Sequence, residues 1–222
     1  MKQLLPLIAL IMFGCTQIKE QTMIKVRNCD AGIFTHSVNS PNCDMQNGTI
    51  TICSGAKSDF FNAPDGSVRI ASAPLLLKKI DNTKPFTFTV IVKPCFVNTY
   101  DAGAVYMFCD EELWQKFAFE MDERGYTRLV TVRTKGTSDD NNHDAITQEE
   151  VYMKISSDSK TVGFYYSLEG QQWQLVRLYR NDYPDSIYIA LSSQSPVGDG
   201  NKTQFTKIEL TENNIDNFRL GL

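Results

Sequence analysis

The sequence lacks the signatures of several large classes of enzyme and nucleic-acid-binding protein. It has only two histidines, His36 and His143, and nothing beside either indicates a metal site or a Ser-His triad. A Gly-rich phosphate loop and a dinucleotide fingerprint are both missing. The net charge of −4 argues against a nucleic-acid partner, which would require a basic face. These absences leave binding functions and carboxylate chemistry as the hypotheses to examine.

No apolar run reaches the about 20 residues that a membrane-spanning helix needs. The run Leu4–Phe13, interrupted by Pro6, instead has the length of a signal-peptide core. It ends at Gly14-Cys15, and a small residue before a Cys at this place resembles a bacterial lipoprotein signal. We therefore predict an exported periplasmic or cell-surface lipoprotein, anchored to the membrane by lipid on Cys15. The alternatives are a signal peptide without lipid and an apolar N-terminus on a cytoplasmic protein.

The cysteines predict no structural zinc site, because none of the six lies in a CxxC arrangement. If Cys15 carries lipid, five remain, and an odd number cannot all pair within the chain. Cys29 and Cys43 flank a loop and could pair in an oxidising compartment. The sequence alone does not fix that pairing.

Helical periodicity is missing as well, and the chain reads as strand after strand. Turn signals such as Asn47-Gly48 and Glu169-Gly170 separate the apolar runs. Roughly a dozen short strands at this spacing predict a sandwich of two stacked antiparallel sheets, one of them curved, as in jelly rolls. We expect one all-β domain over residues 21–222, behind a signal and linker segment over residues 1–20.

The chain is organised around a predicted three-stranded meander between Asp101 and Thr134. Successive side chains of a strand point to opposite faces, which divides the middle strand, Leu113–Met121, into two sets. One face is mostly apolar and belongs to the core: Gln115, Phe117, Phe119 and Met121. The other combines an aromatic ring, a cation, a small residue and a carboxylate: Trp114, Lys116, Ala118 and Glu120.

This second face predicts a ligand-binding concavity lined by Trp114, Lys116 and Glu120. An indole covers the apolar side of a sugar ring, while a carboxylate and an ammonium bind its hydroxyls. We place Asp101, Ser138 and Asp139 at the rim. The alternative is a structural face, in which the Trp belongs to the core and the two charges pair with neighbouring strands.

No metal ligand set is predicted. The oxygen-rich segment from Ser138 to Asp144 could hold calcium, but it lacks the spacing of an EF-hand loop. The usual explanation of such a run is a mobile surface loop.

Several motifs in a fixed order resemble the regulation-of-enolase-protein family, which is catalogued as a domain of unknown function. The resemblance covers about Phe34 to Leu210 and rests on Ser58-Asp59-Phe60-Phe61, Ala73-Pro74-Leu75, Tyr100-Asp101-Ala102-Gly103, Trp114-Gln115-Lys116 through Glu120, Val130-Thr131, Ser138-Asp139, Tyr166-Ser167-Leu168-Glu169-Gly170 with Trp173 and Arg177, and Ser195-Pro196. It implies a concanavalin-A-like jelly roll, related to lectins and glucanases. Phe61 and Asp140 stand where the family usually has Trp. If those Trp residues form sugar-stacking platforms, this chain has lost part of one.

The same fold hosts binders and hydrolases, so the resemblance does not supply an activity. Glycosidases with this fold carry carboxylates at alternate positions of one strand, and a retaining enzyme needs two carboxyl groups about 5–5.5 Å apart. Glu120 and Asp122 begin such a pattern, but Arg124 and Gly125 end it. We therefore expect Glu120 to bind and not to cleave. The leading hypothesis is a non-catalytic, lectin-like module for a glycan or another small polar ligand. The alternatives are a regulatory or scaffold protein with a protein partner and a divergent glycoside hydrolase.

Overall fold

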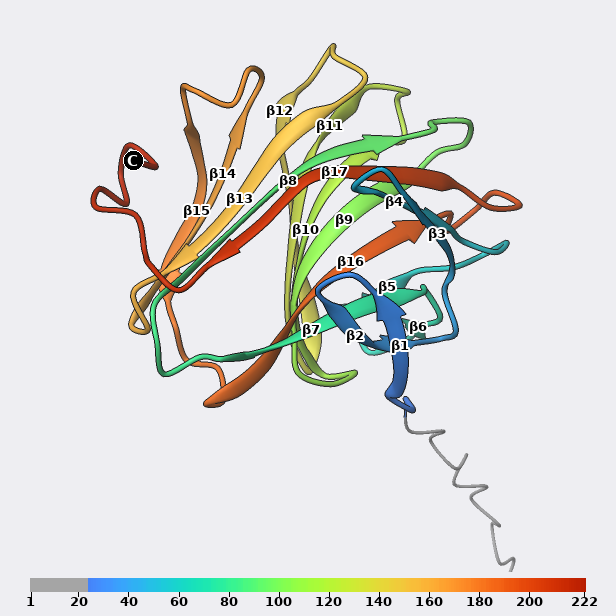
Figure 1. Cartoon of the computed structure of the whole chain (residues 1–222). Coiled ribbons are helices and arrows are strands. Elements are labelled where there is room, and N and C mark those ends of the chain that lie inside the picture. Colours follow the sequence, from blue (N-terminus) through green and yellow to red (C-terminus); the bar gives the residue numbers. More distant parts are fainter. Residues whose placement is uncertain (1–23) are drawn as a thin grey trace, which may run out of the picture.

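Two antiparallel sheets are stacked as a sandwich in this computed structural model, which describes residues 24–222 (Figure 1). The larger sheet has eight strands, in the order β1 (Arg27–Ala31), β2 (Phe34–Val38), β7 (Leu75–Asp81), β16 (Ser186–Gln194), β9 (Ala102–Phe108), β10 (Leu113–Met121), β11 (Thr127–Lys135) and β12 (Thr137–Ala145). The smaller sheet has seven, in the order β15 (Gln174–Arg180), β14 (Thr161–Ser167), β13 (Val151–Ser157), β8 (Phe86–Pro94), β17 (Lys202–Thr211), β4 (Thr49–Cys53) and β3 (Asn42–Gln46). A separate hairpin joins β5 (Phe60–Asn62) to β6 (Arg69–Ala71).

The predicted all-β jelly roll is confirmed, and the alternating apolar residues form its core. Phe117 and Phe119 of β10 point between the sheets, as expected from their phase on the strand. They meet residues of the opposite sheet, and the ring of Phe117 stacks on that of Phe164 with 5.2 Å between centroids. The four alternate apolar side chains of β8 lie in the same core: Phe86, Phe88, Val90 and Val92.

The predicted meander is also confirmed, since β10 pairs with β9 on one side and β11 on the other. Its middle strand has the bounds expected from the sequence. The segment from Ser138 to Asp144 does not form the mobile loop that its composition suggested. It belongs to β12, which pairs with β11 as the last strand of the larger sheet. Its acidic and amide side chains are tolerated because most of them face solvent.

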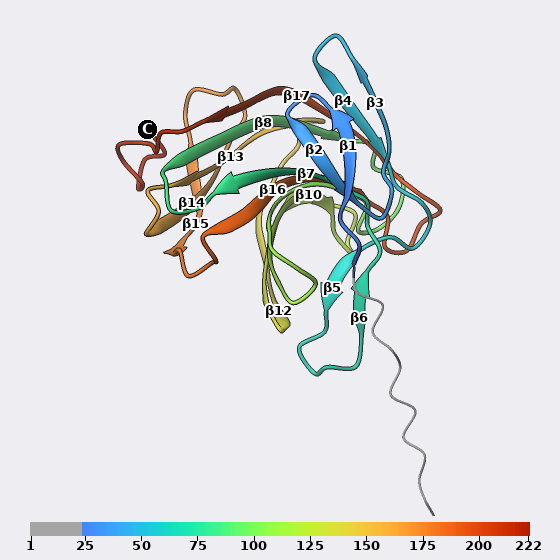
Figure 2. The same cartoon turned by 60° about the horizontal axis from the view of Figure 1, so that its bottom comes forward.

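A second apolar cluster covers the outer face of the larger sheet, which is concave. Small side chains on neighbouring strands leave room above this face: Ala102, Ala104, Ala118 and Ala190. The β5–β6 hairpin fills part of that room, and Figure 2 shows it below the curved sheet, across from β12. Its Phe60 ring lies edge-on to the rings of Phe108 and Trp114, at 5.8 and 6.0 Å between centroids.

Gly103 lets the two sheets approach each other behind the concave face. A Cβ at this position would lie 2.4 Å from Cγ2 of Thr203 and 2.6 Å from Cγ1 of Val92. Both distances are shorter than real contacts allow, so a larger residue would push the sheets apart. Gly103 therefore sets how closely β9 of the larger sheet packs on β8 and β17 of the smaller sheet.

Two sequence-based expectations fall at the N-terminal end. The predicted signal segment, with Cys15, lies outside the described residues. Cys29 and Cys43 are free thiols in the structure, so the disulfide that they could form is not present. Across residues 24–222 there is no helix long and apolar enough to cross a membrane.

Candidate ligand pocket on the concave face

A pocket of about 300 Å³ opens on the concave face beside the hairpin. Strand β10 supplies its floor with Lys116 and Glu120. The walls come from the hairpin, the loop before β9, the β10–β11 turn, β11, β12 and the end of β16: Asp59, Phe61, Tyr100, Glu123, Val130, Val132, Asp140, Asn142 and Pro196. Two of the six residues predicted for the site, Lys116 and Glu120, therefore line it.

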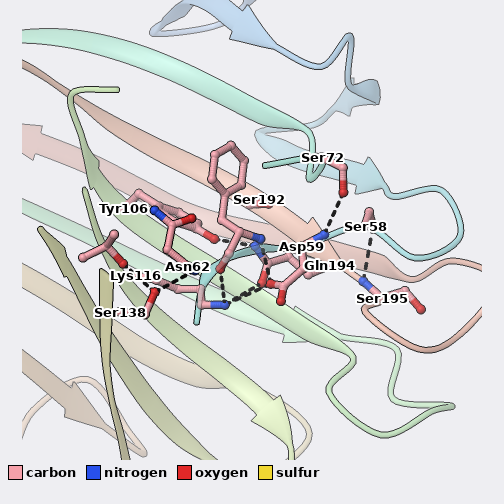
Figure 3. Close-up of polar contacts among 12 residues, drawn as sticks. Ser58, Asp59, Asn62, Ser72, Tyr106, Lys116, Ser138, Ser192, Gln194 and Ser195 are labelled. Carbon is pink, nitrogen blue, oxygen red and sulfur yellow. Dashed lines mark hydrogen bonds and ion pairs between the residues drawn. The ribbon is translucent and has the colours of Figure 1, made fainter. Parts of the chain in front are cut away.

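Lys116 is held by protein groups on three sides. Its Nζ donates hydrogen bonds to Oδ1 of Asp59 at 3.1 Å, to the Phe60 carbonyl at 3.2 Å and to Oε1 of Gln194 at 3.2 Å (Figure 3). Gln194 in turn donates to the hydroxyl of Tyr106. Burial alone would lower the pKa of Lys116, but the Asp59 carboxylate and its other acidic neighbours outweigh it and raise the pKa above the ordinary value. The ammonium is therefore charged, and Asp59 largely satisfies it.

Glu120 lies at the other end of the floor and has no such partners. The residue is only 9% exposed, and within residues 24–222 no group donates a hydrogen bond to its carboxyl oxygens. Burial raises its pKa from 4.5 to about 8; the Lys116 ammonium opposes this shift, and the carboxylates of Asp59, Asp140 and Asp122 add to it. Near neutral pH, Glu120 is therefore mostly an uncharged acid that faces the pocket.

The cation nearest in register to Glu120 is directed elsewhere. Arg128 of β11 pairs with Glu120 in the sheet. Its guanidinium instead donates to Oδ2 of Asp122 at 2.8 Å and to the His143 carbonyl at 3.1 Å. The neighbour on the other side, Ala102, offers no polar side chain. Neither of its two neighbours in the sheet therefore gives the Glu120 carboxyl group an ion pair or a hydrogen bond.

Neighbouring acids of β12 point in opposite directions. Asp140 lies opposite Val132 in the sheet and lines the pocket. Burial raises its pKa, although Lys116 opposes that shift. Asp139, the predicted rim residue, has a side chain that is 72% exposed and lies 3.8 Å from the Arg177 guanidinium outside the pocket. The alternation of the strand therefore assigns the pocket position to Asp140.

Two aromatic rings, Phe61 and Tyr100, line the pocket and are only half-buried. Tyr100 has a φ of 66°, a left-handed conformation that a bulky residue rarely adopts. The side chain of the next residue, Asp101, holds the loop that contains Tyr100. Its Oδ2 accepts hydrogen bonds from the backbone amides of Val97 and Asn98, and its Oδ1 accepts one from the Ser195 hydroxyl at 2.7 Å. Asp101 is fully buried, so it positions the rim and does not form it.

Trp114 and Ser138 also lie outside the pocket. The Trp114 indole is completely buried under the hairpin, and its Nε1 donates to the Glu111 carbonyl at 3.2 Å. It has no free face for a sugar, because Phe60 covers it. The Ser138 hydroxyl accepts the Asn62 amide at 3.0 Å and shares a hydrogen bond with Thr134, so it ties the hairpin to β12.

Glu120 and Asp122, the two carboxyl groups that begin the glycosidase-like pattern, have different environments in the structure. Oδ1 of Asp122 accepts the Arg124 and Tyr126 amides, at 2.9 and 2.8 Å, and Oδ2 is bound by Arg128. Burial raises its pKa, but these hydrogen bonds and the guanidinium outweigh burial and hold it below the ordinary value. Asp122 therefore closes the turn as a buried anchor. It is not part of the pocket lining.

Several pocket residues were missed from the sequence: Asp59, Phe61, Tyr100, Asp140 and Asn142. Asp59, Phe61 and Tyr100 stand in motifs that carry the family resemblance, which is the signal that could have pointed to them. Asp140 and Asn142 would have required recognising residues 137–145 as a strand, because alternation then places them on the face of Val130 and Val132.

The family match agrees with this fold. The family model described as "Protein of unknown function (DUF1349)" matches residues 38–213, and the chain belongs to that family. A comparison with curated protein sequences finds no match.

Solved structures share the sandwich at low sequence identity. A functionally unknown protein from Saccharomyces cerevisiae superposes with a TM-score of 0.73 at 22% identity, over 79% of this chain and 95% of that one. An engineered GH43 glycoside hydrolase gives a TM-score of 0.56 at 14% identity, over 76% of this chain but only 35% of the enzyme. A legume lectin-like domain from Entamoeba histolytica gives 0.51 at 6% identity, over 78% and 87% of the two chains. These likenesses show a fold shared with lectin-like and glycoside-hydrolase structures, and they assign no ligand.

Proposed function

We propose that this protein is a non-catalytic, lectin-like module that binds a glycan in the pocket formed by Lys116, Glu120, Phe61, Tyr100 and Asp140. The observation that carries the proposal is Glu120, a residue that is only 9% exposed, lines the pocket and forms no hydrogen bond or ion pair within residues 24–222. Its oxygens are not among the fully buried polar atoms that lack a partner, so they open into the pocket. A ligand hydroxyl or other donor would satisfy them.

The aromatic rings of the pocket supply the apolar surface that a sugar site needs besides its polar groups. Sugar rings have an apolar side that packs on aromatic faces, and polar edges that need hydrogen-bonding groups. Phe61 and Tyr100 take the stacking role that the sequence had suggested for Trp114. The exposed edge of the Asn142 amide and the carboxyl groups supply the polar contacts.

Binding is favoured over cleavage by the arrangement of the carboxyl groups. Glycoside hydrolysis needs an acid and a second free carboxylate on the two sides of the scissile bond. Asp122 is bound in the turn and Asp59 is paired with Lys116 at 3.1 Å, which leaves Asp140 and Glu123 as the other carboxyl groups of the lining. A divergent hydrolase therefore remains the alternative to be tested, with turnover that disappears in Glu120→Gln as its signature.

A glycan-array screen tests the proposal. The wild-type protein should bind at least one glycan class, and Glu120→Gln and Phe61→Ala should each abolish that binding while the fold is retained. Glu149→Gln is the matched control, because it removes an exposed carboxylate that pairs with Lys93 outside the pocket. Absence of any glycan binding would refute the function. Equal binding by Glu120→Gln and the wild type would refute the site.

We also propose that the protein is exported and lipid-anchored through Cys15, because that residue closes an apolar run of signal-peptide length. Metabolic labelling with a palmitate analogue should mark the wild type and not Cys15→Ser. Equal labelling of the two would refute lipidation at this residue.

A further inference from the structure

The pocket has far more acidic than basic groups. Its lining carries four carboxyl groups, Asp59, Glu120, Glu123 and Asp140, and a single ammonium, Lys116. Lys116 already lies within hydrogen-bond distance of Asp59. Glu123 lies 3.9 Å from the Arg124 guanidinium, outside the lining, and neither Glu120 nor Asp140 forms an ion pair within residues 24–222. A cationic ligand would therefore meet two carboxyl groups that have no cation of their own.

The pKa values of neighbouring groups respond to this excess of carboxyl groups. Burial raises the pKa of Tyr100, and the nearby carboxylates of Glu123, Glu120, Asp122 and Asp140 raise it further. The pKa of Asp140 is also raised, by burial first. Arg128 lies opposite Glu120 in the sheet, and it is bound to Asp122.

We infer that the ligand of this pocket carries a positive charge, as the protonated amine of an amino sugar does. This inference rests on the proposed function and specifies its ligand class. A ligand ammonium beside Glu120 would meet a carboxyl group that has no partner within residues 24–222, and charge-assisted hydrogen bonds of this kind are about twice as strong as neutral ones. The half-buried rings of Phe61 and Tyr100 also suit a cation, which is attracted to aromatic faces.

A metal ion would be the other cationic occupant, but the geometry does not favour it. Across residues 24–222, no three His, Cys, Asp or Glu side chains are grouped as a metal site requires. The acids instead stand around a hollow of about 300 Å³, which has room for a sugar ring. An organic ammonium is therefore the cation that fits.

Binding of an ammonium should release a proton. Glu120 is mostly protonated near pH 7, because its pKa is about 8. A positive charge beside it stabilises the carboxylate, so the proton leaves the carboxyl group and passes to the buffer. A neutral sugar would leave the proton in place.

Isothermal titration calorimetry of the purified protein at pH 6, where the probe amines are largely protonated and Glu120 still holds its proton, tests the inference with three probes: a glucosamine tetramer, an N-acetylglucosamine tetramer and Ca²⁺. We expect the glucosamine tetramer to bind about tenfold tighter than its acetylated counterpart, in line with one charge-assisted contact. The apparent enthalpy should change between buffers of different ionisation enthalpy, which reports proton release. Glu120→Gln should remove both the preference and the proton release, and Glu149→Gln should keep both.

The outcomes separate this inference from the proposed function. Binding of neutral glycans alone, or equal affinity for both tetramers, would overturn the positive charge and leave glycan binding intact. Binding of Ca²⁺ alone would overturn the amino sugar in favour of a metal site. Binding of none of the probes, together with an empty glycan array, would overturn both.

Discussion

The two halves of the concave face differ although they share strands and alternation. In the covered half, the β5–β6 hairpin closes over Trp114, Tyr106 and Phe108, and the face is a dry aromatic cluster. In the open half, Glu120 and Asp140 lie beyond the hairpin and line the pocket. Lys116 stands between the two halves. The phase of a side chain on a strand therefore determines which face it occupies, and a segment distant in sequence determines whether that position is core or site.

The largest expected effect is the loss of stability when Phe60 of β5, and not its neighbour Phe61, is replaced by alanine. Phe60 is fully buried against Trp114, whereas its neighbour Phe61 lines the pocket. Phe60→Ala should destabilise the protein by about 4 kcal/mol, because it opens a cavity in the covered half. Phe61→Ala should cost less than about 1 kcal/mol and weaken ligand binding. Urea unfolding of both variants checks this, and equal destabilisation would erase the distinction between the halves.

The next effect concerns the boundary residue. Lys116→Met removes the partner of Asp59, whose side chain is only 13% exposed, and leaves a carboxylate unpaired under the hairpin. Breaking a buried pair in this way should cost about 3 kcal/mol. The double variant Lys116→Met/Asp59→Asn removes both charges and should recover part of that loss. A double variant as unstable as the single one would show that the pair contributes little.

In the open half, removing the charge of Glu120 should stabilise the protein, whereas the substitutions in the covered half and at Lys116 destabilise it. Glu120 has a pKa of about 8 in the folded protein against 4.5 when exposed, so the folded state retains a proton that the unfolded state has lost between these values. Stability from this group therefore falls as pH rises from 4.5 to 8 and is constant outside that window.

Glu120→Gln removes that penalty. The variant should be more stable than the wild type by about 2 kcal/mol at pH 8.5, and the difference should shrink as the pH falls toward 4.5. Thermal unfolding at pH 4, 6 and 8.5 measures it, with Glu149→Gln as the exposed control. A variant that is less stable at every pH would place Glu120 in the structural half of the face.

The sequence was sufficient to predict the core strands of the sandwich, but not the contacts of the β5–β6 hairpin that covers part of the concave face. Alternation on β10 placed Phe117 and Phe119 in the core, because a two-residue period is a local property. The fate of Trp114 depended on Phe60, which arrives from 54 positions away in the chain. The Asp59 partner of Lys116 likewise comes from a separation of 57 residues. No local pattern reports such contacts.

The β12 strand was missed for a different reason. Asp and Asn are rare in strands, so residues 138–144 read as a loop. The strand forms because its backbone pairs with β11, and its polar side chains remain largely in solvent. With the strand unrecognised, the choice between Asp139 and Asp140 could not be made from alternation.

The smallest effect tests that choice. Asp140 lines the pocket, and Asp139 points away toward Arg177. Asp140→Asn should weaken binding of the glucosamine tetramer about fivefold, a loss of roughly 1 kcal/mol, because it removes one of the acids that face the ligand. Asp139→Asn changes the net charge equally and should alter the affinity less than about twofold, since an exposed charge outside the site is screened by solvent. Calorimetry of the two variants decides between them. If Asp139→Asn caused the larger loss, the ligand would have to contact the outward face of β12, and the open half of the concave face would not be the site.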